Sequence, residues 1–198
     1  MRISHGRMAA RSPTKPIMKE RILETADRLF YLKGIRAIGV DTIAAEIGIS
    51  KRTLYNHFPS KEALISAYLE RRFVRHTPSD KRSEISPVEQ ILGIFDSLER
   101  RFSAKDFRGC PFVNVATELA NPHHPARAVA RDYKLSLQRY FARQARVGGA
   151  KNPKPLAEQL LMLFDGAICQ AVVKSAPVPD STRAAAKILL DAHGLTDD

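Results

Sequence analysis

Apolar residues recur every three or four positions along almost the whole of this 198-residue chain, and alternating runs of β-branched residues are missing. This period places apolar side chains along one face of a helix, whereas a half-buried strand needs an apolar residue at every second position. Over residues 17–33, for example, Ile22 and Ala26 share a face, and Gly34 follows at a position typical of a helix end. The pattern therefore predicts an all-α fold.

Two short helices are predicted to follow this first one. The first covers residues 40–47 and ends at Gly48. Ser50 provides an N-cap for the second, which runs through Phe58. Gly48 permits a tight turn, and Ile49 fills the angle between the two helices. The two helices and their turn have the spacing of a helix-turn-helix.

Proline residues divide the rest of the chain. Pro59 ends the third helix, Ser60 caps a fourth, and the polar stretch 75–86 is predicted to be a loop. Most of the later helices have a proline at or just before their start, where the missing amide hydrogen costs nothing. These helices are predicted near residues 87–105, 111–120, 125–147, 155–176 and 180–193.

The chain therefore has three predicted parts. Residues 1–16 form a disordered basic arm, which either reaches into a minor groove of DNA or has no role. Residues 17–63 form a three-helix domain that contains the helix-turn-helix, and residues 64–198 form a larger helical domain.

The net charge of +11 is concentrated in the first part of the chain. Residues 1–76 hold fifteen Lys and Arg against seven Asp and Glu, whereas the remainder holds seventeen against fourteen. A basic surface attracts nucleic acid because binding releases counterions from the phosphates. The alternative is a basic face that only keeps the protein in solution.

Several classes of protein are disfavoured. No apolar run approaches the roughly 18 residues that span a bilayer, and the N-terminus lacks the apolar stretch of a secretory signal. Two cysteines are too few for a disulfide framework, so we expect a reduced, cytoplasmic protein. Cys110, at a predicted helix start, is either a small buried residue or a redox-sensitive thiol.

Signals for catalysis and for metal binding are equally weak. The chain has no nucleophile elbow, no phosphate loop and no dinucleotide fingerprint. His123 and His124 are adjacent but lack the further ligands that zinc needs. We therefore expect no enzyme activity, no cofactor and no metal.

The helix after Ser50 carries the residues that point to function. Leu54 and Phe58 lie four positions apart and face inward, so the remaining side chains point outward or sideways. These are Lys51, Arg52, Thr53, Tyr55, Asn56 and His57. An exposed helical face this rich in hydrogen-bond donors fits the major groove of DNA. The alternative is a surface helix hairpin with no partner.

A distinctive set of residues lies between positions 22 and 64, namely Ile43-Ala44, Gly48, Ser50, Thr53-Leu54-Tyr55, His57-Phe58, Ser60-Lys61-Glu62 and Leu64. It resembles the signature of the tetracycline-repressor (TetR) family of bacterial transcriptional regulators. The resemblance implies an N-terminal DNA-binding domain and a C-terminal helical domain for ligand binding and dimerisation. It also implies a homodimeric repressor that binds a palindromic operator in double-stranded DNA and is released by a small, mostly apolar effector. The alternatives are a non-specific architectural DNA-binding protein and a ligand carrier that has lost DNA binding.

The resemblance also implies roles for single residues. Lys51 and Arg52 occupy positions that read base edges, where a bidentate contact to guanine is worth about 1–3 kcal/mol. Tyr55 occupies the position of an aromatic that contacts a thymine methyl group or the backbone, unless it packs partly into the core. Phosphate-contacting positions, which orient the protein without reading sequence, hold Thr53, Asn56, His57 and Lys61. His57 could instead cap the end of its helix.

One part of the signature differs. Gly39 and Val40 stand where many relatives have a Thr or Ser hydroxyl that touches phosphate. Asp41 would repel phosphate if it faced the DNA, and Thr42 remains as the hydroxyl that could replace the lost contact.

For the second domain the resemblance implies a mostly apolar ligand pocket between helices. Each predicted lining residue either lines this pocket or is an ordinary core residue. Asn114 and Gln170 are further polar residues that could line it. The predicted lining residues are Phe95, Leu98, Phe102, Phe112, Val115, Leu119, Tyr133, Leu137, Phe164, Asp165 and Ile168.

The last two helices are more apolar than a monomer needs, and their alanines permit close approach. We therefore predict a two-fold interface of four helices, as a palindromic operator requires. The predicted interface residues are Leu156, Leu160, Leu163, Ala167, Ala171, Ala184, Ala185, Ile188 and Leu189.

Overall fold

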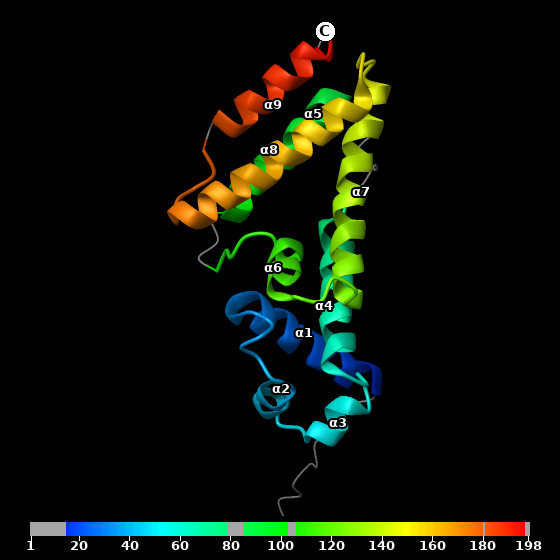
Figure 1. Ribbon diagram of the computed structural model, residues 1–198, viewed down its shortest axis with the longest axis vertical. Helices are drawn as coiled ribbons and strands as arrows, with labels where there is room; N and C mark the ends of the chain where they lie inside the picture. Colours follow the sequence, from blue (N-terminus) through cyan, green and yellow to red (C-terminus); the bar gives the residue numbers. More distant parts are fainter. Residues whose placement is uncertain (1–14, 79–84, 103–105, 180, 197–198) are drawn as a thin grey trace, which may run out of the picture.

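The computed structural model describes residues 15–78, 85–102, 106–179 and 181–196, and every regular element within these ranges is a helix (Figure 1). The all-α prediction is therefore confirmed. The helices are α1 (Lys15–Lys33), α2 (Val40–Ile47), α3 (Lys51–Tyr55), α4 (Lys61–His76), α5 (Pro87–Phe102), α6 (Pro111–Glu118), α7 (Pro125–Val147), α8 (Pro153–Lys174) and α9 (Ser181–Ala192).

Three predicted boundaries need correction. Lys15 and Pro16 belong to α1 rather than to the arm, and the rest of the arm, residues 1–14, lies outside the described residues. Helix α3 ends at Tyr55 instead of Phe58, and Phe58 could not have continued it, because a residue that directly precedes proline is driven out of the α region. Helix α8 begins at Pro153, two positions earlier than predicted, because proline is well suited to the first turn of a helix.

Local caps hold the short helices as the sequence predicts. The Ser50 hydroxyl accepts a hydrogen bond from the Thr53 amide at 3.1 Å, and the Ser60 hydroxyl accepts one from the Ala63 amide at 3.1 Å. Gly48 has φ +71°, a left-handed conformation that a residue with a Cβ rarely adopts. The turn between α2 and α3 is therefore built from local chemistry.

The N-terminal helices share a core of fully buried side chains. Ile22 of α1, Ile43 of α2 and Leu54 of α3 each have 0% exposure. Helix α1 packs against both α2 and α4. Each fully buried aliphatic side chain contributes about 1.5–3 kcal/mol, so these few contacts set the angle at which α3 stands.

Helix α7 is the centre of the larger domain and packs against α4, α5, α6 and α8. Its Tyr133 ring stacks on Phe112 of α6 with ring centroids 3.8 Å apart, and its Phe141 ring stacks on Phe95 of α5 at 6.2 Å. Figure 1 shows α2 and α3 at one end of the long axis and α9 at the other.

Helix α4 joins the two halves. The predicted domain boundary between residues 63 and 64 lies inside it. The buried carboxylate of Asp27 in α1 pairs with Arg72 at 2.5 Å and with Arg75 at 3.2 Å, both in α4. The hydroxyl of Tyr31 in α1 donates to the Gly109 carbonyl at 3.1 Å, just before α6. The helix-turn-helix is therefore tied to the larger domain by polar contacts as well as by packing.

Candidate nucleic-acid interface

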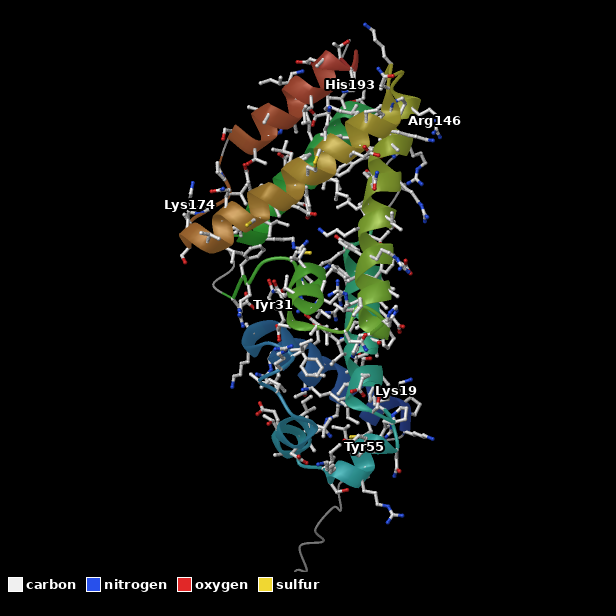
Figure 2. The ribbon with its side chains drawn as sticks, in the orientation of Figure 1. Lys19, Tyr31, Tyr55, Arg146, Lys174 and His193 are labelled. Atoms are coloured by element: carbon white, nitrogen blue, oxygen red, sulfur yellow. The ribbon has the colours of Figure 1, made fainter. Side chains whose placement is uncertain are left out.

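Helix α3 presents its outward face at the end of the molecule. Leu54 is fully buried and Phe58 is 4% exposed, which turns the opposite face toward solvent. Lys51, Arg52, Tyr55 and Asn56 are exposed there. Figure 2 shows Tyr55 at this end of the molecule.

Two of the predicted contact residues are less accessible. The Thr53 side chain is half-buried, and its hydroxyl lies 2.9 Å from that of Ser50. His57 is also half-buried, and its Nδ1 is a buried atom with no hydrogen-bond partner. Phosphate contacts by these two residues remain predictions.

Asp41 and Lys51 form an ion pair across the turn, with Oδ2 and Nζ 3.0 Å apart. The hydrogen bond that Lys51 donates to the Asp41 carboxylate raises the pKa of the Lys51 ammonium above its ordinary value. The repulsion between Asp41 and DNA expected from the sequence is therefore offset by its own partner. Arg52, in contrast, makes no ion pair with any described residue, so its guanidinium is available for a ligand.

The remaining candidates lie on neighbouring turns. Thr42 is exposed in the first turn of α2, whose N-cap Gly39 has no side chain to bond the helix. Lys61 begins α4 and is half-buried. The sequence reasoning missed Lys19, whose ammonium lies 5.6 Å from the centre of the Phe58 ring. Only the tertiary structure reveals it, because Lys19 lies in α1 and Phe58 follows α3 in the chain.

The predicted pocket residues do not enclose one large cavity. Leu98, Phe112, Tyr133, Phe164 and Ile168 line an internal cavity with a volume of about 10 Å³. That is roughly the room that one water molecule needs. The apolar stripes are therefore mostly core in this conformation.

The other predicted lining residues have local partners. Phe95, Val115 and Leu137 are buried in the core, and Leu119 caps the end of α6. The Phe102 ring lies against Phe107, with the centroids 4.3 Å apart.

The polar pocket candidates are occupied or face solvent. Asp165 pairs with Lys134, Asn114 donates to the Arg108 carbonyl at 2.8 Å, and Gln170 is exposed. None of the three points to a ligand.

A larger cleft, of about 500 Å³, lies beside the small cavity and was not predicted. Its lining residues are Arg75, His76, Pro78, Ile85, Glu89, Gln90, Gly93, Ile94, Ser97, Arg100, Arg101 and Tyr140. Its volume falls in the range of small-molecule sites, about 300–1,000 Å³. Spacing along the chain did not reveal this cleft, because Arg75, His76, Pro78 and Ile85 of its lining lie in the stretch predicted to be a loop.

His76 and Arg101 line both the small cavity and the larger cleft. The Arg101 guanidinium donates to Nε2 of His76 at 2.8 Å. Burial, together with the nearby charge of Arg101, lowers the pKa of His76 to about 4. The imidazole is therefore neutral at pH 7.

The predicted dimer residues divide between the core and the surface. Leu156, Leu160, Ala167 and Ala171 are wrong as contact residues, because each is buried inside its own chain. Ile188 is 67% exposed, Ala184 is exposed, and Leu163, Ala185 and Leu189 are half-buried. Apolar residues occur all around α8, so their spacing could not predict which face packs into the core and which face is exposed.

The exposed apolar face of α8 was missed. Met162 is 66% exposed and Val173 is 77% exposed, with Gly166 and Cys169 between them on the same face. Helix α8 is long and apolar enough to cross a membrane by length and composition, but its other face packs into the core. Its surplus apolar surface is a candidate for contact with another chain.

The histidine pair has a structural role. His124 caps α7, since its Nδ1 accepts a hydrogen bond from the Ala126 amide at 3.1 Å. Within the described ranges, no three His, Cys, Asp or Glu side chains could hold a metal ion together. Cys110 is 7% exposed and Cys169 is exposed.

Comparisons with known proteins agree with the geometry of α2 and α3. The family model for bacterial regulatory proteins of the TetR family matches residues 22–68. The HTH-type transcriptional regulator YxaF of Bacillus subtilis is 31% identical over 169 residues, which span 83% of this chain and 87% of that protein. The HTH-type transcriptional regulator LmrA of the same organism is 34% identical over 119 residues, 58% of this chain and 63% of that protein.

Solved structures agree over nearly the whole chain. A TetR transcriptional regulator from Streptomyces avermitilis superposes with a TM-score of 0.82 at 36% identity, and the match covers 90% of this chain and 98% of that one. A TetR-family regulator from Streptomyces coelicolor superposes with a TM-score of 0.80 at 26% identity over 88% of this chain and 95% of that one. These relatives are transcriptional regulators and not enzymes.

Proposed function

Because this chain belongs to the TetR family of bacterial transcriptional regulators, we propose that it is a cytoplasmic, homodimeric repressor. In this proposal α3 of each subunit enters the major groove of one half of a palindromic operator, and a small molecule bound in the larger domain releases the DNA. Regulation of transcription through DNA binding is the activity of the family. Repression, symmetry and the response to a ligand are the parts that we add.

The exposed face of α3 carries the proposal. Arg52 stands at its first turn without an ion-pair partner among the described residues, and Tyr55 is 39% exposed on the same short helix. A guanidinium can donate two hydrogen bonds to one guanine, which discriminates base pairs by about 1–3 kcal/mol. The Ser50 cap and the buried Leu54 hold this face in one orientation.

The exposed apolar faces of α8 and α9 support a dimer. Met162, Val173 and Ile188 are each more than 60% exposed, and α8 and α9 pack side by side. Pairing this surface with its copy would form a four-helix contact. It would also place two copies of α3 on one side of a two-fold axis, as a palindrome requires.

Helix α4 supports a response to a ligand. It begins beside the helix-turn-helix and ends at His76, which lines the 500 Å³ cleft. Its Arg72 and Arg75 hold Asp27 of α1. A ligand that moves the end of α4 would therefore change the position of α1 and, through it, the separation of the two copies of α3.

The experiment is selection of binding sites from random duplexes at physiological salt. The expected product is an inverted repeat with half-sites about 34 Å, or a multiple of that, apart, bound about 10³-fold more tightly than random duplex. Arg52→Ala should lose preference at one base pair per half-site, while Arg139→Ala, at an exposed arginine on α7, should not. An architectural DNA-binding protein would select no symmetric site.

A further inference from the structure

The lining of the 500 Å³ cleft contains more arginine side chains than acidic ones. Its acidic lining residue, Glu89, already pairs with Arg183 of α9 at 3.3 Å. Arg75, Arg100 and Arg101 line the same cleft. An anion entering this space would therefore meet cations on more than one wall.

Arg101 is the most constrained of these cations. It is half-buried and makes no ion pair with any described residue. Its neutral partner His76 accepts one hydrogen bond at 2.8 Å, whereas a guanidinium carries five N–H donors. Because Arg101 is partly buried and has no counterion among the described residues, its remaining donors are suited to an acidic group.

The rest of the cleft is suited to an apolar body. Ile85, Ile94 and the ring of Tyr140 contribute to its wall. The internal cavity behind His76 is too small for anything but a water molecule, at about 10 Å³. The ligand must therefore remain in the outer cleft, with its acidic group near the inner end, where Arg101 lies.

Arg75 connects this cleft to the DNA-binding domain. Arg75 is a lining residue of the cleft, and its guanidinium pairs with Asp27 of α1 at 3.2 Å, although the side chain is 52% exposed. A second carboxylate or sulfonate in the cleft would compete with Asp27 for Arg75. Asp27 would then keep only its ion pairs with Arg72 and Arg71 of α4.

We propose that the effector is an organic anion with an apolar body, that its acidic group binds Arg101, and that it draws Arg75 away from Asp27. This inference rests on the proposed function and names the ligand class of the effector site. It differs from the sequence prediction, which placed a mostly apolar ligand among the aromatic residues of the core.

The test uses two fluorescent probes with the full-length protein. The first is 8-anilinonaphthalene-1-sulfonate, an aromatic anion, and the second is N-phenyl-1-naphthylamine, which has the same rings without the sulfonate. Arg101→Gln should weaken binding of the anion at least tenfold and change binding of the neutral probe less than twofold. Arg101→Lys, which keeps the charge, should retain most of the affinity, and Arg75→Gln should weaken binding of the anion about threefold.

Arg139→Gln is the matched control, because Arg139 lies in a second basic groove between α7 and α8 with Arg143, Arg146 and Lys154. The proposal is overturned if Arg101→Gln binds the anion as wild type does, or if Arg139→Gln loses as much affinity as Arg101→Gln. If Arg101→Gln does not unfold cooperatively, the proposal is judged from the two other variants. Arg101→Lys should then keep most of the affinity for the anion, and Arg75→Gln should lose about threefold.

A DNA-binding measurement distinguishes failure of this ligand assignment from failure of the repressor proposal on which it rests. With a duplex obtained by site selection, the sulfonate probe should lower the affinity of the wild type and leave that of Arg101→Gln unchanged. If the probe binds at Arg101 but site selection yields no duplex, the repressor proposal is contradicted and the ligand assignment is not. Release of DNA by the probe in both proteins would place the effector elsewhere and refute the ligand assignment.

Discussion

Replacing Asp27 by asparagine should destabilise the protein more than loss of any other ion pair described here. The Asp27 side chain is 8% exposed and lies between Arg72, at 2.5 Å and 15% exposed, and Arg75, at 3.2 Å and 52% exposed. Arg71 is a third neighbour, at 3.9 Å. Asp27→Asn keeps the shape of the side chain but removes the negative charge that holds these three cations together.

The magnitude follows from burial. Removing one partner of a buried ion pair costs about 3–5 kcal/mol, because the other charge remains buried without a partner. The half-exposed Arg75 adds no more than about 1 kcal/mol, because water screens it. Since Asn keeps one acceptor oxygen, we expect a loss of about 3 kcal/mol in the free energy of unfolding. For a chain of this size that lowers Tm by about 6–12 °C.

The matched control is Glu46→Gln. Glu46 pairs with Arg28 at 2.6 Å, also between two helices, but the two side chains are 47% and 50% exposed. This change should cost less than about 1 kcal/mol. The measurement is urea unfolding of both variants and the wild type at one protein concentration, because the proposed dimerisation would couple stability to concentration.

A double-mutant cycle with Arg72→Gln isolates the pair itself. The coupling energy between Asp27 and Arg72 should exceed about 1.5 kcal/mol if the two charges stabilise each other in the folded protein. The reasoning is refuted if Asp27→Asn costs no more than Glu46→Gln, because burial would then not determine the value of these contacts.

Asp41→Asn should raise affinity for random duplex and steepen its dependence on salt, because Lys51 loses its partner and one negative charge leaves the interface; unchanged salt titrations would contradict this. His76 should reduce stability in acid: its pKa is about 4 in the folded state, so only the unfolded state takes up a proton between pH 6.5 and 4. Urea unfolding at pH 7.5 and 4.5 should therefore show a loss about 1–2 kcal/mol larger for the wild type than for His76→Gln, after allowance for solvent screening, and an equal loss would exclude this role. Val173→Glu should convert the proposed dimer to a monomer in light scattering, whereas Val74→Glu, at an 82% exposed position on α4, should leave the proposed dimer intact.

Contacts between residues close in the chain could be predicted from the sequence. Ser50 and Ser60 cap α3 and α4 as expected, and Gly48 has the left-handed conformation that its turn needs. Each of these features depends on residues within one or two helical turns. The candidate reading face of α3 follows from the same local spacing, because Leu54 alone determines which side of so short a helix is turned inward.

Contacts between helices far apart in the chain were decided only by the tertiary structure. The periodicity of α8 allowed Leu156 and Met162 equally well to face another chain. Packing of α8 against α7, α9 and α5 left Leu156 buried and Met162 exposed. The pairing of His76 with Arg101 and of Asp27 with Arg72 likewise joins residues on different helices. Helical period determines which residues share a face, but which neighbour covers that face depends on how all the helices bury their apolar surface together.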